Sequence, residues 1–294
     1  MSASKINRRE SMWGFLFLLP NLIGFVLFSL IPVVVAFVLS LTDWDGISKI
    51  NFMWFENYID LFKDESFRIA LYNTFIYTIA FVPLTLFLGL MIAMLLNNKL
   101  KGIGVYRLIY FIPYIASAVA ISYVFSALLH PTLGPINNML RSFGIDNPPQ
   151  WLTSPNWAMF SVIVMSVWKN FGYYVVMFLA GLQGVPSSLY EAATIDGAGG
   201  WNKFKHITIP LITPVTFFCI IMATINSFKV FDQVYILTEG GPGRATTTIV
   251  QYIYESSFQN YQMGYASAAA VVLFGIIFIV TLVQYRGQNK WVNY

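Results

Sequence analysis

The chain has 294 residues, of which 57% are hydrophobic, 17% aromatic and only 10% charged, and its net charge is +4. A soluble domain usually carries about 25% charged residues, so this composition excludes an ordinary water-soluble protein and predicts that lipid covers much of the surface. The single cysteine, Cys219, excludes an internal disulfide and a cysteine-based metal cluster.

The first apolar run has no charged residue from Met12 to Thr42. A secretory signal has an apolar core of roughly 7–15 residues followed by a cleavage site with small residues. This run is about twice as long and lacks such a site. We therefore expect it to remain in the protein as a membrane anchor.

Six apolar runs are long enough to cross a membrane as helices, which takes roughly 20 residues each. They lie at about 13–41, 72–96, 107–129, 157–182, 209–228 and 264–285. Backbone groups in lipid must bond internally, and no alternating strand pattern competes. The predicted fold class is an all-α membrane protein with six transmembrane helices. Residues 1–12 and 286–294 form short tails, and 183–208 form a loop between helices 4 and 5.

The basic residues predict the orientation of these helices. Most of them fall on the side that holds both termini and the loop at 183–208: Lys5, Arg8, Arg9, Lys99, Lys101, Arg107, Lys203, Lys205, Arg286 and Lys290. Acidic residues outnumber basic ones on the other side. Because lysine and arginine favour the cytoplasmic side of a membrane, both termini are predicted to be cytoplasmic.

The sequence indicates no catalytic centre. No segment between the apolar runs is long enough for a nucleotide-binding domain, and no GxxxxGK[ST] phosphate loop is present. His130 and His206 fall on opposite sides of the membrane, and no HExxH pattern exists, so we expect no bound metal and no cofactor on this chain. If transport consumes ATP, another chain must hydrolyse it.

The loop at 183–208 has the spacing of two short helices separated by glycines. Ser188 and Glu191 match a capping box, which predicts that a helix starts at Ser188. Gly197, Gly199 and Gly200 are predicted to end it. Trp201–Ile209 resume helical spacing and lead into the fifth span, where Pro210 suits a first turn. This pattern alone fits a docking surface and an otherwise idle polar hairpin about equally well.

Four ordered blocks then give a resemblance. Glu191-Ala192-Ala193, Asp196-Gly197-Ala198, Ile207, Pro210 and Pro214 resemble the EAA loop of importer-type ABC permeases. Ala180–Gln183, Phe231–Gln233, Thr238–Pro242 and Gly264–Ala268 are similar to carbohydrate-uptake permeases of the maltose-transporter type. The similarity covers nearly the whole chain.

The resemblance implies a permease in the cytoplasmic membrane of a prokaryote, with several partners. It would pair with a second, related permease and with two cytoplasmic ATPase subunits that bind ATP and magnesium. An external sugar-binding protein would deliver the substrate, and no nucleic acid is expected. The residues expected to couple to the ATPase, on a coupling helix, are Tyr190, Glu191, Ala192, Ala193, Asp196 and Gly197.

Two sets of residues are candidates for the substrate path. The first is a stripe on the fourth span with spacing i, i+3, i+4, i+7 and i+11: Ser166, Lys169, Asn170, Tyr173 and Met177. A charge within a span usually faces protein or water, so the stripe predicts a sugar path or a seam with the second permease, with Lys169 paired to a partner carboxylate. The second set, at the outer end of the fifth span, is Asn226, Phe228, Phe231 and Asp232. Its aromatic residues suit anchors at the lipid–water boundary better than a gate.

Two further alternatives stay open at this point. The loops at 43–68 and 130–156 could receive a binding protein or simply cover the helices. A secondary transporter driven by an ion gradient is the rival function, although such proteins usually place carboxylates within spans. None of the six predicted spans contains Asp or Glu, which argues against the rival.

Overall fold

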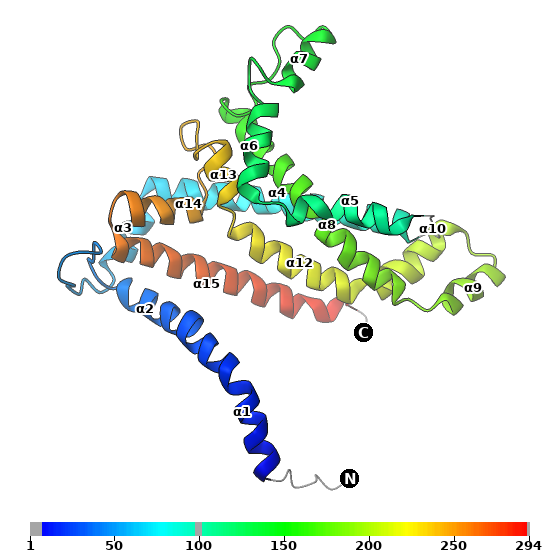
Figure 1. The fold of residues 1–294 in the computed structure, drawn as a ribbon, viewed down its shortest axis with the longest axis horizontal. Coiled ribbons are helices and arrows are strands. Elements are labelled where there is room, and N and C mark those ends of the chain that lie inside the picture. The colour runs from blue at the N-terminus through cyan, green and yellow to red at the C-terminus, as the bar shows by residue number, and fades with distance from the viewer. Residues whose placement is uncertain (1–7, 98–101, 293–294) are drawn as a thin grey trace. The chain divides into compact units, whose positions relative to one another are not determined.

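The computed structural model describes residues 8–97 and 102–292, and helices make up most of that part of the chain (Figure 1). The described part holds no named strand, only an isolated bridge between Thr42 and Phe52. Lys5, Lys99, Lys101 and the outermost residues of both predicted tails lie outside the described residues.

The described elements are α1 (Arg8–Phe25), η1 (Val26–Leu30), α2 (Ile31–Leu39), α3 (Glu56–Lys63), α4 (Glu65–Leu96), α5 (Ile103–Ile115), α6 (Ala118–Leu128), α7 (Pro135–Ser142), α8 (Pro155–Gln183), α9 (Ser187–Ile195), α10 (Gly200–Lys203), η2 (Phe204–Thr208), α11 (Ile209–Leu211), α12 (Thr213–Phe228), α13 (Asp232–Leu237), α14 (Ile249–Tyr254), η3 (Glu255–Gln259), α15 (Met263–Gly287) and η4 (Gln288–Lys290).

Four described helices are long and apolar enough to cross a membrane unaided: Trp13–Leu39, Glu65–Leu96, Pro155–Gln183 and Met263–Lys290. Two more candidates are helix pairs bent at a short break. α5 and α6 meet at 93°, and the helix Gly200–Leu211 meets α12 at 63°. Counting each bent pair as one span gives six, as the hydropathy predicts.

The third and fifth predicted spans differ from the structure because neither is one continuous helix. Between α5 and α6 the backbone is extended at Ala116, and Pro113 inside α5 already removes a main-chain donor. In the fifth span the preceding helix runs past Pro210, and the membrane helix begins at Thr213. Pro214 cannot donate to the carbonyl of Pro210, which instead accepts a hydrogen bond of 2.6 Å from the Thr213 hydroxyl.

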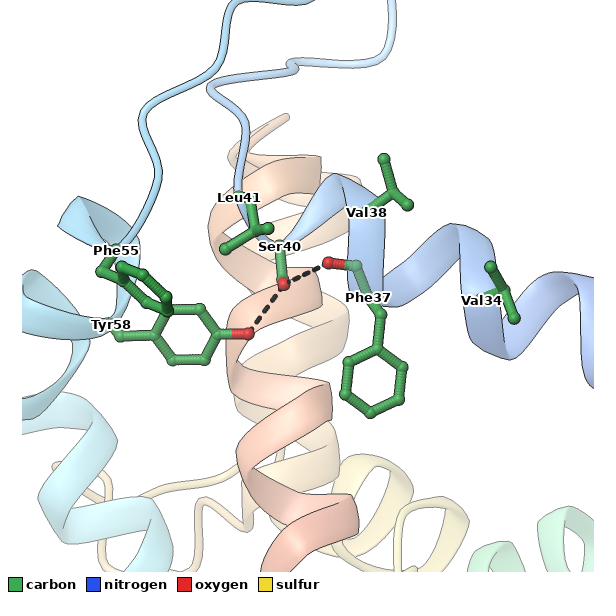
Figure 2. A pocket seen from close by; sticks show the side chains of 7 residues that line it. All are labelled: Val34, Phe37, Val38, Ser40, Leu41, Phe55 and Tyr58. Atoms are coloured by element: carbon green, nitrogen blue, oxygen red, sulfur yellow. Dashed lines mark hydrogen bonds between the residues drawn. The ribbon is translucent and has the colours of Figure 1, made fainter.

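Two compact units are distinguished, and the first joins the N-terminal segment through Lys63 to Ile253–Val272. Here polar bonds fix the end of α2. The Ser40 hydroxyl donates to the carbonyl oxygen of Phe37 at 2.7 Å and lies 2.7 Å from the Tyr58 hydroxyl, beside an apolar pocket of about 440 Å³ (Figure 2). Buried Asn57 donates to the carbonyl oxygens of Ser40 and Thr42 at 3.0 and 2.7 Å. These bonds supply donors to carbonyl oxygens that lie at or past the end of α2, where no helical N–H is available to pair with them.

The second unit comprises Asp64–Tyr252 and the chain from Leu273, and α4 and α8 form its centre. Tyr174, Val175 and Phe178 of α8 pack with apolar side chains of α4 and α12 in one buried cluster. Two glycines allow close approach: Gly89 lies against Tyr174, and Gly172 lies against the carbonyl oxygen of Tyr110 in α5. This packing fixes the end of α8 and the start of α12. The polar loop at 183–208 lies between these two helices.

Candidate functional site

The polar loop between α8 and α12 forms a short helical hairpin (Figure 1). Every residue of α9 is exposed or half-buried, although the helix follows the well-packed α8. The predicted capping box is wrong, because α9 begins at Ser187. Pro186 is the N-cap residue, and no side chain caps the helix. Ser188 therefore lies in the first turn, where its hydroxyl cannot serve as the cap.

Gly197 ends α9, as predicted, through a Schellman motif. Its φ is +77°, in the left-handed region that favours glycine. The N–H of Ala198 donates to the carbonyl oxygen of Ala193 at 2.8 Å, and the N–H of Gly197 donates to that of Thr194 at 3.1 Å. Gly199 has a negative φ and precedes α10. The end of α9 is thus a defined turn.

The structure divides the predicted coupling residues between two faces of α9. Glu191 and Ala192 are exposed and share a face with Ile195, which is not among the predicted coupling residues and is 87% accessible. The Tyr190 hydroxyl instead lies 3.0 Å from Thr208 Oγ1 in η2. Ala193 is half-buried, and Asp196 is exposed at the end of the helix. The exposed face therefore combines the carboxylate of Glu191, the small side chain of Ala192 and, at the end of the helix, the apolar side chain of Ile195.

A polar cavity of about 310 Å³ in the second unit brings together members of both substrate-path sets. Asn170 of α8, Asn226 of α12 and Phe231 line it. The other described lining residues are Tyr77, Phe81, Lys229, Val230, Asp232 and Gln233. Sequence reasoning missed Tyr77 and Phe81, because they lie within the apolar second span, where aromatic residues give little contrast in hydropathy. Only their i, i+4 spacing could have indicated a shared face.

Aromatic pairs and a braced loop shape this cavity. The rings of Tyr77 and Phe81 stack at 5.3 Å, and the ring of Phe231 stacks on Tyr235 at 5.2 Å. The Thr248 hydroxyl donates to the carbonyl oxygen of Val230 at 3.1 Å. The wall around Val230 and Phe231 is therefore held by the segment that follows the cavity in the chain.

The remaining stripe residues on α8 lie outside the described lining of this cavity. Lys169 is 7% exposed, and its ammonium donates to the carbonyl oxygen of Tyr114 at 3.1 Å. The Tyr114 ring stacks on Tyr173 at 4.9 Å. Ser166 is buried, and Met177 packs against the main buried cluster. Only Asn170 of the stripe lines the cavity; a path role for the others stays a prediction.

Lys169 has a role that the sequence did not indicate. Tyr114 lies in the last turn of α5, where carbonyl oxygens lack intrahelical partners, and a cation there is favourable. The ammonium also lies 5.7 Å from the centre of the Tyr114 ring. Lys169 thus fixes the end of α5 at the 93° bend, through a main-chain carbonyl of its own chain.

We expect Lys169→Met to lower the stability of the protein by about 1–3 kcal/mol, because it leaves the Tyr114 carbonyl without its buried donor. The melting temperature of the purified protein measures this effect. Tyr106→Phe, at an exposed position of the same helix α5, is the control. A variant with unchanged melting temperature but weakened substrate binding would contradict this structural role and support contact with substrate.

The anchor interpretation is wrong for Phe228. It is 1% exposed, and its ring packs edge-on against Phe75 at 5.3 Å. An aromatic side chain at the end of a span suits a lipid boundary only if it faces outward. Phe228 therefore packs in the interior of the second unit, against α4.

The segment Thr238–Thr248 is a compact loop. The hydroxyls of Thr238 and Thr246 lie 2.7 Å apart, and Asn73 of α4 donates to the carbonyl oxygens of Arg244 and Thr247 at 2.9 and 3.0 Å. Gly240 has a φ of +81°, and a Cβ there would lie 2.6 Å from Thr247 Oγ1. The Thr-Glu-Gly-Gly-Pro block thus encodes a fixed loop shape.

Known proteins are similar to this chain in sequence, and a solved structure is similar to it in fold. Residues 85–292 match the family described as binding-protein-dependent transport system inner membrane component. The lactose transport system permease LacF of Rhizobium radiobacter is 35% identical over 98% of both chains. The trehalose/maltose transport system permease MalF of Thermococcus litoralis is 35% identical over 96% of both.

A solved structure shows the same fold. It is a chain of a bacterial ABC transporter involved in the import of the acidic polysaccharide alginate, with a TM-score of 0.85 and 23% identity. The match covers 97% of this chain and 98% of the chain in the solved structure. Permeases of this kind are membrane subunits and not catalytic ATPases. The chain belongs to the family of inner-membrane permeases of binding-protein-dependent ABC transporters.

Proposed function

We propose that this permease forms, with a second related permease, the pathway of an ATP-driven importer for a sugar, specifically an oligosaccharide. The observation that carries the proposal is the exposed face of α9, presented on a defined hairpin between two packed helices. LacF and MalF, at 35% identity over nearly their whole lengths, are named for di-saccharide transport systems and support a carbohydrate cargo.

In this proposal the α9 hairpin and both chain ends face the cytoplasm. The distribution of lysine and arginine supports this orientation, because Lys203 and Lys205 lie in the hairpin and Arg286 and Lys290 lie beyond the last span. Two ATPase subunits, which bind ATP and magnesium, dock from that side, one on each permease. The external binding protein delivers the cargo from the other side.

The outward face of α9 has the chemistry for a helix that enters a groove. Ala192 has almost no side chain and permits close approach of the partner backbone. Ile195 supplies an apolar anchor, and Glu191 supplies a charge for a basic residue of the ATPase. ATP-driven closure of the ATPase pair then moves α9, and the movement reaches α8 and α12 at the two ends of the hairpin.

The cavity that Asn170, Asn226 and Phe231 line is the proposed substrate path. The amides of Asn170, Asn226 and Gln233 can both donate to and accept from sugar hydroxyls. The rings of Tyr77 and Phe231 can cover the apolar faces of a pyranose. The cavity is therefore suited to a neutral, hydroxyl-rich solute.

Replacing Glu191 with alanine, or Ala193 with proline, tests the proposed coupling. Proline inside α9 removes a main-chain donor and disrupts the helix, so uptake and binding-protein-stimulated ATP hydrolysis are expected to fall below a tenth of wild type. Glu191→Ala is expected to weaken ATPase docking by about 1–3 kcal/mol, the typical loss for a charge-assisted contact. Uptake of maltotriose, trehalose and lactose into proteoliposomes provides the measurement.

Two matched controls separate coupling from general damage. Ser187→Pro places proline at the first position of the same helix, where the missing N–H has no helical partner to lose. Glu56→Ala removes an exposed acid at the start of α3. Both controls should behave like wild type. Normal uptake by the Glu191→Ala and Ala193→Pro complexes would contradict the coupling role of α9.

A further inference from the structure

A chain of hydrogen bonds joins the inner face of α9 to the following helix. The Tyr190 hydroxyl lies 3.0 Å from the hydroxyl of buried Thr208, which in turn donates to the carbonyl oxygen of Lys203 at 3.5 Å. One turn along α9, Lys203 Nζ donates to Thr194 Oγ1 at 2.8 Å, and the Thr194 hydroxyl donates to the carbonyl oxygen of Tyr190 at 2.6 Å. Two side chains of α9 are therefore tied to two of α10–η2.

The π-helical turn η2 makes this arrangement possible. Tyr190 and Thr194 are four residues apart and share one face of α9. Lys203 and Thr208 are five residues apart, and in an α-helix that spacing separates side chains by about 140° around the axis. In η2 the hydrogen bond runs from the N–H of Ile209 to the carbonyl oxygen of Phe204, the wider i→i+5 pattern. This wider turn brings Lys203 and Thr208 onto the same face, toward α9.

The main chain between the two helices is a poor link for transmitting force. It contains Gly197, Gly199 and Gly200, and glycine has the largest conformational freedom of any residue. Thr208, by contrast, lies in the helix that ends at Leu211, directly before the bend into α12. Beside the bond between Lys203 and Thr194, the contact between Tyr190 and Thr208 therefore connects α9 directly to the end of the helix that leads into α12.

We propose that Tyr190 and Thr208 are positioning residues for coupling: their hydrogen bond makes α9 and Gly200–Leu211 one rigid unit, so that a displacement of α9 reaches α12. The inference rests on the proposed function of α9. It assigns Tyr190 to the inside of the hairpin and leaves docking to Glu191, Ala192 and Ile195. Loss of the bond leaves the ATPase attached and weakens transmission.

The test uses the full complex with its ATPase subunits, in a Cys219→Ser background that carries Gln233→Cys at the cavity. The readout is the change in labelling of Cys at this position by a membrane-impermeant maleimide when Mg-AMP-PNP is added. Tyr190→Phe and Thr208→Val are each expected to reduce this nucleotide-induced change about fivefold, as loss of one neutral hydrogen bond does to an equilibrium. Co-purification of the ATPase should stay at wild-type levels.

Three further variants identify the bond as the cause. The Tyr190→Phe/Thr208→Val double variant should respond like Thr208→Val alone, because that single variant already lacks the bond to Tyr190. Thr208→Ser keeps a hydroxyl and should restore the response. Ser122→Ala removes a hydroxyl that bonds within α6, to the carbonyl oxygen of Ala118, and should respond like wild type.

The outcomes separate this inference from the proposed function. A wild-type response in Tyr190→Phe and Thr208→Val, or additive losses in the double variant, would overturn the positioning role. Retained ATPase attachment and a normal response in Glu191→Ala and Ala193→Pro would instead contradict docking by α9.

Discussion

Alanine in place of Gly172 is expected to prevent the permease from reaching a stable fold. A Cβ at this position would lie 1.8 Å from the carbonyl oxygen of Tyr110, a main-chain atom of α5. The clash between this Cβ and the Tyr110 carbonyl oxygen cannot be relieved without moving α5 away from α8. This movement also separates Lys169 from Tyr114. We expect a loss of about 3 kcal/mol or more in folding free energy. Fluorescence-detected size-exclusion of the tagged complex measures the loss.

The control for this prediction is Gly104→Ala. Gly104 also lies in a helix, α5, and a Cβ there would meet no atom within 4 Å. Alanine has the higher helix propensity, so this variant should be at least as stable as wild type. A Gly172→Ala complex that elutes and melts like wild type would show that α5 and α8 do not approach as closely as described.

The second large effect is expected at Gly264, at the start of α15 in the first unit. Its N–H donates to the carbonyl oxygen of Trp44 at 2.8 Å, and a Cβ would lie 2.0 Å from the carbonyl oxygen of Thr42. Alanine would push the segment after α2 away and break the Trp44 bond. We expect a loss of about 3 kcal/mol, measured as a lower melting temperature and a lower yield of assembled complex.

Gly275→Ala in the same helix is the matched comparison, because a Cβ there meets no atom within 4 Å. It should leave melting temperature and yield unchanged or slightly raised. Equal behaviour of the two variants would rule out a tight approach at Gly264. The Gly-Tyr-Ala-Ser-Ala block that begins α15 is explained by this approach, since only glycine leaves room for the carbonyl of Thr42.

Hydropathy was sufficient to predict the fold class, because lipid imposes a minimum length on every span. It could not predict the bends. The break after Ile115 depends on a lysine and a glycine of α8, more than 50 residues away in the chain. The capping-box prediction failed for a local reason: Pro186 occupies the cap position, and its restricted φ places the helix start one residue before Ser188.

The candidate site shows the same limit. The resemblance predicts coupling residues at Glu191 and Ala192, and the structure exposes both of them beside Ile195, which the prediction did not include. The inward position of Tyr190 depends on the π-helical turn, for which the sequence carries no clear signal. Tyr77 escaped prediction because an aromatic residue within an apolar run gives no contrast in hydropathy. Such residues are recognised only when the opposing helix is known.

The break at Ile212 has a consequence for the energy of movement. Pro214 cannot donate to the Pro210 carbonyl oxygen, which instead accepts from the Thr213 hydroxyl at 2.6 Å and from the N–H of Ile212. Rotation of the preceding helix about this point therefore strains main-chain bonds on both sides of Ile212, whose N–H donates to the carbonyl oxygen of Thr208 at 3.1 Å and whose carbonyl oxygen accepts from the N–H of Thr216 at 2.9 Å. In lipid, where each such bond costs several kcal/mol to break, a bend held in this way favours movement of the preceding helix and α12 together.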